Sequence, residues 1–145
     1  MNVVHLGRRF FTSVSPRRPA ADDEAWAERW LLDAEVDLWR RMTNPDRRHA
    51  IEVGRRFFAR RPEATRAEMA GALLHDVGKL DSGLGTFARV AATLVGPRTA
   101  RFRAYHDHEA IGARLAESAG SDPVTVAVIE GRGPAAADLR AADDL

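Results

Sequence analysis

Hydrophobic and polar residues recur with helical spacing over most of the chain. The stretch 22–42 opens with two Asp and carries two Arg near its end, which suits the dipole of a helix. Its apolar positions step by three or four residues: Ala27, Leu31, Ala34 and Leu38. Three tryptophans accompany this stripe and are interpreted as packing residues: Trp26, Trp30 and Trp39. The pattern predicts one continuous helix over residues 22–42.

Start signals predict the next two helices. Asn44 followed by Pro45 is typical of an N-cap and the first residue of a helix. One face of this helix combines a histidine with two apolar residues: His49, Val53 and Phe57. Thr65 and Glu68 have the spacing of a capping box, which predicts the start of another helix. That helix is expected to run to the His-Asp pair that follows it.

The rest of the chain predicts four further helices: 85–96, 108–120 with Asp107 as its cap, 121–131 and 133–145. In residues 121–131 two signals disagree. The valines favour a strand, whereas Asp122 and Pro123 favour a helix start. No partner strand is apparent, so a buried helix is predicted. The sequence as a whole predicts an all-α bundle of about six to seven helices.

Composition narrows the possible functions. At 145 residues the chain suits one domain, expected over 22–145, with residues 1–21 as an N-terminal arm. The chain has no cysteine, so any metal must be bound by His and carboxylate groups. The net charge of +1 argues against a dedicated nucleic-acid surface. No stretch is apolar enough for a membrane span or a signal peptide, and a cytoplasmic location is expected.

The stretch ALLHDVGKLDSG places His75 and Asp76 side by side at the end of an apolar run. Such a pair is costly to bury unless a metal ion or a hydrogen-bond network compensates it. Gly78 is expected to be a helix C-cap, a position that favours positive φ. Lys79, one residue later, is the only lysine of the chain.

The candidate metal ligands are one histidine or carboxylate from each of several helices: His49, His75, Asp76, His108 and an Asp of the last helix. Neighbours in a helix point about 100° apart, so His75 and Asp76 can converge on one ion only at a helix end. A shell of nitrogen and oxygen ligands suits Mn, Fe, Ni or Zn and, less well, Mg.

Four stretches together resemble the HD-domain superfamily of metal-dependent phosphohydrolases: RRHAIEVGRRF, GALLHDVGKL, HEAIGARL and LRAADDL. The likeness covers residues 43–145. It implies an HD-type bundle of five or more helices, one or two divalent ions and the hydrolysis of phosphate esters, usually of nucleotides. By the same resemblance one ion is held by four residues: His49, His75, Asp76 and Asp143, with Asp144 as the less favoured closing ligand.

The resemblance also implies roles beside the metal. Lys79 matches a lysine near the phosphate, and His108 matches a histidine that holds a second, looser ion or protonates the leaving group, with His106 as a spare candidate. Where members with two metals carry a further histidine, this chain has Arg132. Arg132 either holds a substrate phosphate by a forked contact or is a plain loop arginine.

Two functions follow as expectations. The first is a metal-dependent phosphohydrolase acting on a small phosphorylated ligand, such as a nucleotide. The second is an HD module of weak catalytic power that binds metal and a nucleotide or protein partner in a regulatory role. The sequence makes no prediction of oligomeric state.

Overall fold

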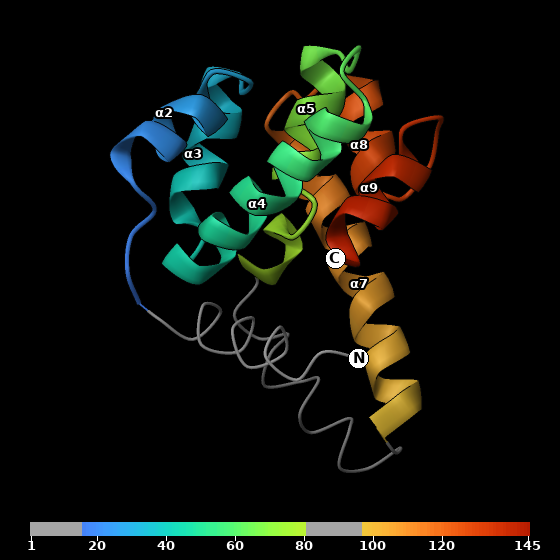
Figure 1. The fold of residues 1–145 in the computed structure, drawn as a ribbon. Helices are drawn as coiled ribbons and strands as arrows, with labels where there is room; N and C mark the ends of the chain where they lie inside the picture. The colour runs from blue at the N-terminus through green and yellow to red at the C-terminus, as the bar shows by residue number, and fades with distance from the viewer. Residues whose placement is uncertain (1–15, 81–96) are drawn as a thin grey trace.

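The computed structural model describes residues 16–80 and 97–145, and for residues 80 and 97–107 the description is limited to the backbone. Within these ranges the chain forms seven α-helices and no strand (Figure 1), so the predicted all-α fold is confirmed. The helices are α2 (Ala21–Glu28), α3 (Asp33–Arg41), α4 (Asn44–Arg60), α5 (Arg66–Leu73), α7 (Pro97–Ser118), α8 (Pro123–Ile129) and α9 (Ala136–Asp143), with the 3-10 helix η1 (Val77–Leu80) after α5. The helix predicted over 85–96 and most of the proposed N-terminal arm lie outside the described residues.

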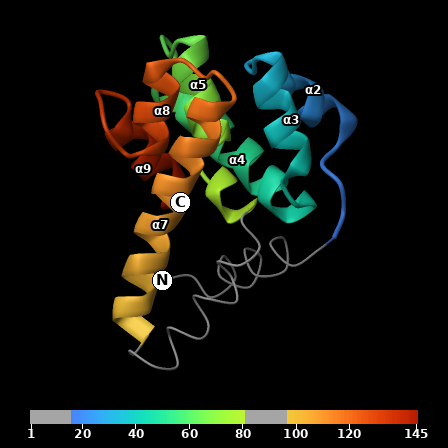
Figure 2. The same cartoon turned by 180° about the vertical axis from the view of Figure 1, so that it is seen from behind.

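Helix α4 runs through the middle of the bundle, with α2 and α3 on one side and α5, α8 and α9 on the other (Figure 1). Helix α4 packs against both α5 and α9, and α5 packs against α8. Seen from behind, α7 lies beside η1 and α8, against which it packs, and extends past the other helices at its N-terminal end (Figure 2). Elements from both ends of the chain therefore meet around α4.

The single helix predicted over 22–42 is wrong, because the chain breaks into α2 and α3 at residues 29–32. The break is stabilised by Glu35, whose Oε1 accepts a hydrogen bond from the backbone N–H of Leu32 at 2.8 Å. Glu35 is fully buried and also accepts hydrogen bonds from Arg66 and Ser121. The break also turns the predicted apolar stripe, so that Ala34 is exposed.

The start signals of the later helices are correct with small changes. Thr65 and Glu68 form the predicted capping box. The cap of α4 is Thr43, one residue before the prediction, because its hydroxyl accepts from the N–H of Asp46. Asp107 is not a cap: α7 begins at Pro97 and passes through residue 107 without interruption. Proline supplies that earlier start, since its fixed φ suits the first turn of a helix.

The Val-rich segment is the predicted helix, α8, which is capped by Asp122. It packs closely on α5: a Cβ at Gly71 would lie 2.6 Å from Val128 Cβ. The buried Thr125 hydroxyl donates to the carbonyl of Ala67 at 2.8 Å, which adds a polar contact between the two helices. Burial of this helix on α5 outweighs the strand propensity of its valines.

The core consists of two clusters of buried side chains that meet at α4 and α5. The first includes Trp39, Ile51, Leu73, Leu74, Val77 and Ile129. The second includes Val53, Phe57, Met69, Val128 and Leu139. The face predicted for His49, Val53 and Phe57 is confirmed, since Val53 and Phe57 are fully buried and His49 is half-buried at its edge. No helix in the described ranges combines the length and apolarity that crossing a membrane requires.

Candidate functional site

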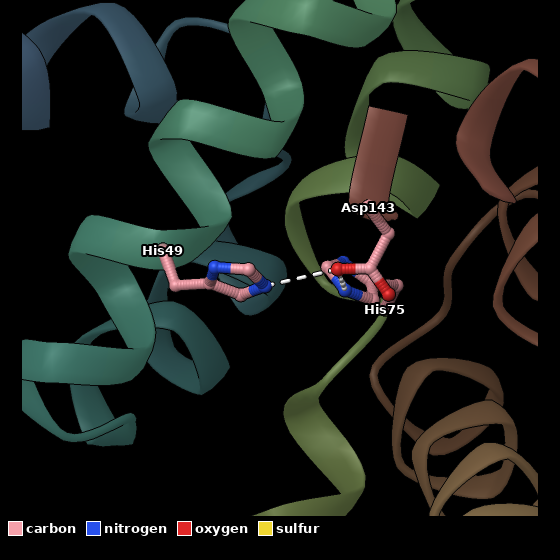
Figure 3. Close-up of side chains that lie close together, drawn as sticks. All are labelled: His49, His75 and Asp143. Atoms are coloured by element: carbon pink, nitrogen blue, oxygen red, sulfur yellow. Dashed lines mark hydrogen bonds and ion pairs between the residues drawn. The ribbon is translucent and has the colours of Figure 1, made fainter. Parts of the chain in front are cut away.

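Two histidines and one aspartate converge from three distant parts of the chain (Figure 3). One ligand atom from each of His49, His75 and Asp143 lies within 4.8 Å of the other two. His49 Nε2 is 2.9 Å from Asp143 Oδ1, and His75 Nε2 is 3.6 Å from the same oxygen. The structure therefore brings together three of the four residues assigned to a metal from sequence.

Local structure orients each member of this cluster. His49 lies on α4, His75 follows the end of α5, and Asp143 is the last residue of α9. His75 Nδ1 lies 2.7 Å from the carbonyl oxygen of Ala72, which fixes the ring and makes Nδ1 the protonated nitrogen. His75 Nε2 then faces the cluster, and it is buried without a hydrogen-bond partner in the described parts of the chain.

The carboxylates of Asp76 and Asp143 favour a positive charge on the group that lies between them, His75. Burial lowers the pKa of His75, but Asp76 and Asp143 outweigh burial and raise this pKa to about 9. The pKa of Asp143 lies well below its usual range, chiefly because of its hydrogen bond with His49 and the adjacent His75. Without a metal, His75 is therefore protonated and Asp143 ionised at neutral pH.

The fourth expected ligand, Asp76, lies beside the cluster. Its Oδ2 is 3.4 Å from His75 Nε2 and 3.3 Å from Lys79 Nζ. Burial raises the pKa of Asp76, but His75 and Lys79 outweigh burial, and the net pKa is lowered. Burial lowers the pKa of Lys79, but Asp76 and Asp46 outweigh it, and the net pKa is raised. Lys79 is thus a charged ammonium held next to the cluster.

The cluster opens into a pocket of about 540 Å³, a volume typical of small-molecule sites. Its polar lining comprises His49, His75, Asp76, Lys79, His108, Glu109, Glu130, Arg140 and Asp143. Its apolar lining comprises Val128, Ile129, Ala136 and Leu139. The pocket thus combines an apolar wall from α8 and α9 with charged groups of both signs.

Close backbone packing places His108 in this pocket. A Cβ at Gly78 would lie 2.0 Å from the carbonyl oxygen of His108 and 3.0 Å from the amide nitrogen of Gly112. Gly78 therefore lets η1 lie directly against α7. The prediction of Gly78 as a helix C-cap is wrong: the C-cap of α5 is Leu74, Gly78 lies within η1, and the described glycines with positive φ are Gly120, Gly131 and Gly133. Close approach, rather than a left-handed cap, requires glycine here.

The structure separates the remaining candidates. Arg132 is exposed and donates to Glu130 at 2.6 Å, and it is not among the described residues that line the pocket. Asp144 is exposed, whereas its neighbour Asp143 lies in the cluster. The side chain of His106 lies outside the description.

Sequence reasoning missed four charged residues of the site. Arg140, Glu109 and Glu130 line the pocket, and Asp46 lies 3.9 Å from Lys79 Nζ. Helical spacing offers a signal for two of them, since Arg140 precedes Asp143 by three residues and Asp46 precedes His49 by three. Glu109 directly follows His108.

The donor set of the cluster fits a divalent transition metal. Two imidazoles and a carboxylate are ligands that Mn, Fe, Ni and Zn accept. The Nε2 of His75 is the clearest sign, because it is buried, makes no hydrogen bond to a described residue, and has only longer contacts with Asp76 and Asp143, at 3.4 and 3.6 Å. A bound metal would take the place of the proton on this nitrogen.

Comparison with known proteins gives no family for this chain. No family model matches it, and no curated protein or solved structure matches it significantly. The argument for function therefore depends on the site itself.

Proposed function

We propose that the protein is a divalent-metal-dependent phosphohydrolase of the HD type, acting on a small phosphorylated ligand such as a nucleotide. The observation that carries the proposal is the convergence of His49, His75 and Asp143 beside a pocket that also contains Lys79. The order of these residues along the chain supports it, because it is the order that the HD resemblance implies.

In this proposal His49, His75 and Asp143 hold the ion, and Asp76 completes the shell or holds Lys79 beside it. When bound, such an ion polarises a phosphoryl oxygen and lowers the pKa of a coordinated water. The ammonium of Lys79 neutralises charge that develops on the phosphoryl group. Asp46 and Asp76 keep this ammonium in place from two sides. His108 supplies a proton to the leaving oxygen.

One observation favours the alternative of a regulatory module. Arg132 occupies the place where HD proteins with two metals carry a histidine, and its guanidinium is paired with Glu130 at the surface. A site with a single ion and no arginine from this loop is poorer in positive charge. Such a site suits binding of metal and ligand with little turnover.

Metal analysis followed by a substrate screen tests the proposal. We expect about one transition metal per chain, and hydrolysis of a phosphate mono- or diester in a screen with Mn, Ni, Co and Mg. His75→Ala should lose both metal and activity. Lys79→Ala should keep the metal and lose about 100-fold in kcat, the usual cost of removing a donor at a developing negative charge.

The outcomes separate the two functions. Metal binding without turnover of any ester favours the regulatory module. A chain that takes up no metal contradicts both. Activity that survives in His75→Ala places the chemistry elsewhere in the protein.

A further inference from the structure

Arg140 lines the pocket from the same helix as Asp143. The two residues are three positions apart on α9, so their side chains leave the helix on neighbouring positions of one face. Both belong to the lining of the pocket. A group bound at the His49, His75 and Asp143 cluster would therefore lie within one helical turn of the backbone that carries Arg140.

The guanidinium of Arg140 lies towards the loop between α8 and α9. Its Nη1 is 4.0 Å from the position that a Cβ on Gly131 would occupy, and Glu109 Oε2 is 3.9 Å from that position. Gly131 itself has no side chain to fill this wall. The Arg140 guanidinium and the Glu109 carboxylate thus both lie near Gly131, and Arg140 supplies the positive charge at this part of the lining.

Arg140 differs from the other cations near the pocket in its partners. Lys79 is paired with Asp76 and Asp46, and Arg132 is paired with Glu130. Among the described residues, the guanidinium of Arg140 makes no hydrogen bond and has no carboxylate within ion-pair distance, although its backbone carbonyl accepts from Asp144. Its five donors are available to a ligand.

The rest of the lining indicates what that ligand is like. Aliphatic side chains form the wall beside Arg140: Val128, Ile129, Ala136 and Leu139. In the described part of the lining, the histidines contribute the only rings, so a stacking platform for a base is not among the features seen. The lining therefore offers charge at two points, the cluster and Arg140, together with apolar side chains and the carboxylates of Glu109 and Glu130.

We propose that Arg140 binds a second anionic group, a carboxylate or a phosphate, on a ligand whose phosphoryl group is held at the His49, His75 and Asp143 cluster. This inference rests on the proposed function and specifies its substrate class: a phosphate ester that carries a further acidic group a few bonds away. A guanidinium suits either group, because its planar fork matches both carboxylate and phosphate oxygens.

Calorimetric titration of the full, Mn-loaded chain with three phosphonates tests this. Propylphosphonate has one anionic group, whereas 4-phosphonobutyrate adds a carboxylate and propane-1,3-diphosphonate adds a phosphonate. We expect wild type to bind at least one of the two longer acids about tenfold more tightly than propylphosphonate, the gain of one charge-assisted hydrogen bond. Which acid gains identifies the second group as carboxylate or phosphate.

Arg140→Ala should lose this gain while its affinities for Mn and propylphosphonate stay as in wild type. Arg140→Lys should keep part of it, because an ammonium retains the charge and loses the fork. Arg41→Ala is the matched control, since Arg41 is also an exposed arginine in the last turn of a helix and lies outside the lining. It should bind all three phosphonates as wild type does.

Equal affinity of wild type for all three phosphonates overturns the inference, and so does a gain that persists in Arg140→Ala. In both cases the proposed function is not contradicted, provided that the chain binds Mn and propylphosphonate. A chain that binds no Mn, or an Mn-loaded chain that binds no propylphosphonate, contradicts the proposed function and this inference with it.

Discussion

His49 Nε2 lies 2.9 Å from Asp143 Oδ1 although 94 positions separate the two residues. The contact depends on the packing of α9 against α4. Arg56, two turns after His49 on α4, donates to the carbonyl of Ala142 at 3.0 Å and so fixes the end of α9. Asp143 is thereby held at a defined place, although helix ends usually fray.

Replacing each of two neighbouring aspartates, Asp143 and Asp144, by asparagine tests whether Asp143 is a ligand. Asp143→Asn keeps the shape of the side chain and removes its charge. Loss of partners outside the ligand shell already costs 10–100-fold in metal affinity, so loss of a ligand should cost about 100-fold. Titration with Mn or Zn measures this. Asp144→Asn alters an exposed carboxylate and should bind metal as wild type does. Equal affinity of the two variants removes Asp143 from the site.

Metal removal should destabilise the wild type and leave a ligand variant unaffected. A ligand that binds only the folded state stabilises by about 2.7 kcal/mol at a concentration of 100 times Kd. We therefore expect thermal unfolding of wild type to shift downward on addition of a chelator, and that of His75→Ala to stay unchanged. A wild-type melting temperature that does not respond to chelator or to added metal contradicts a native metal site.

The fold could be predicted where its signals are local. The box of Thr65 and Glu68 and the cap at Asp122 act within one turn, and both helices start as predicted. The break between α2 and α3 is different. It depends on Glu35, whose partners Arg66 and Ser121 are 31 and 86 positions away, so no window of sequence contains its cause.

The candidate site, like the fold, could be predicted from the sequence only in part. His49, His75 and Asp143 could be named because their residue types and order match those of the HD resemblance, and the structure brings the three together. The pocket could not be outlined from the sequence. Arg140 and Arg132 are both arginines near the end of the chain, and only the packing of α9 shows that Arg140 lines the pocket while Arg132 is exposed.

Glu35 should be among the costliest single residues to remove. Its carboxylate accepts hydrogen bonds from the backbone of Leu32, from Arg66 and from Ser121, at 2.8, 3.2 and 2.6 Å. Glu35→Ala empties a fully buried position and removes the acceptor of Leu32 and Ser121, while Arg66 keeps only the carbonyl of Trp30, so it should lower the free energy of unfolding by about 3 kcal/mol. Urea unfolding followed by circular dichroism measures the change.

Asp37→Ala is the control for Glu35→Ala. Asp37 lies on the same helix and is exposed, so its removal should change the free energy of unfolding by less than about 0.5 kcal/mol. Similar costs for the two variants would show that the buried network does not hold α3 in place.

Gly78→Ala tests the contact that brings η1 and α7 together. The new Cβ would lie 2.0 Å from the carbonyl oxygen of His108, a backbone atom that can move only if the two elements separate. We expect the free energy of unfolding to fall by about 3 kcal/mol, the upper range for overpacking. Because His75 lies three residues before Gly78, metal affinity should fall as well. Gly54→Ala is the matched control, since its Cβ would meet the flexible end of Leu73 at 2.9 Å. Its gain in helix propensity should keep it within about 1 kcal/mol of wild type. If Gly78→Ala is as stable as Gly54→Ala and binds metal as wild type does, close packing at Gly78 does not position the site.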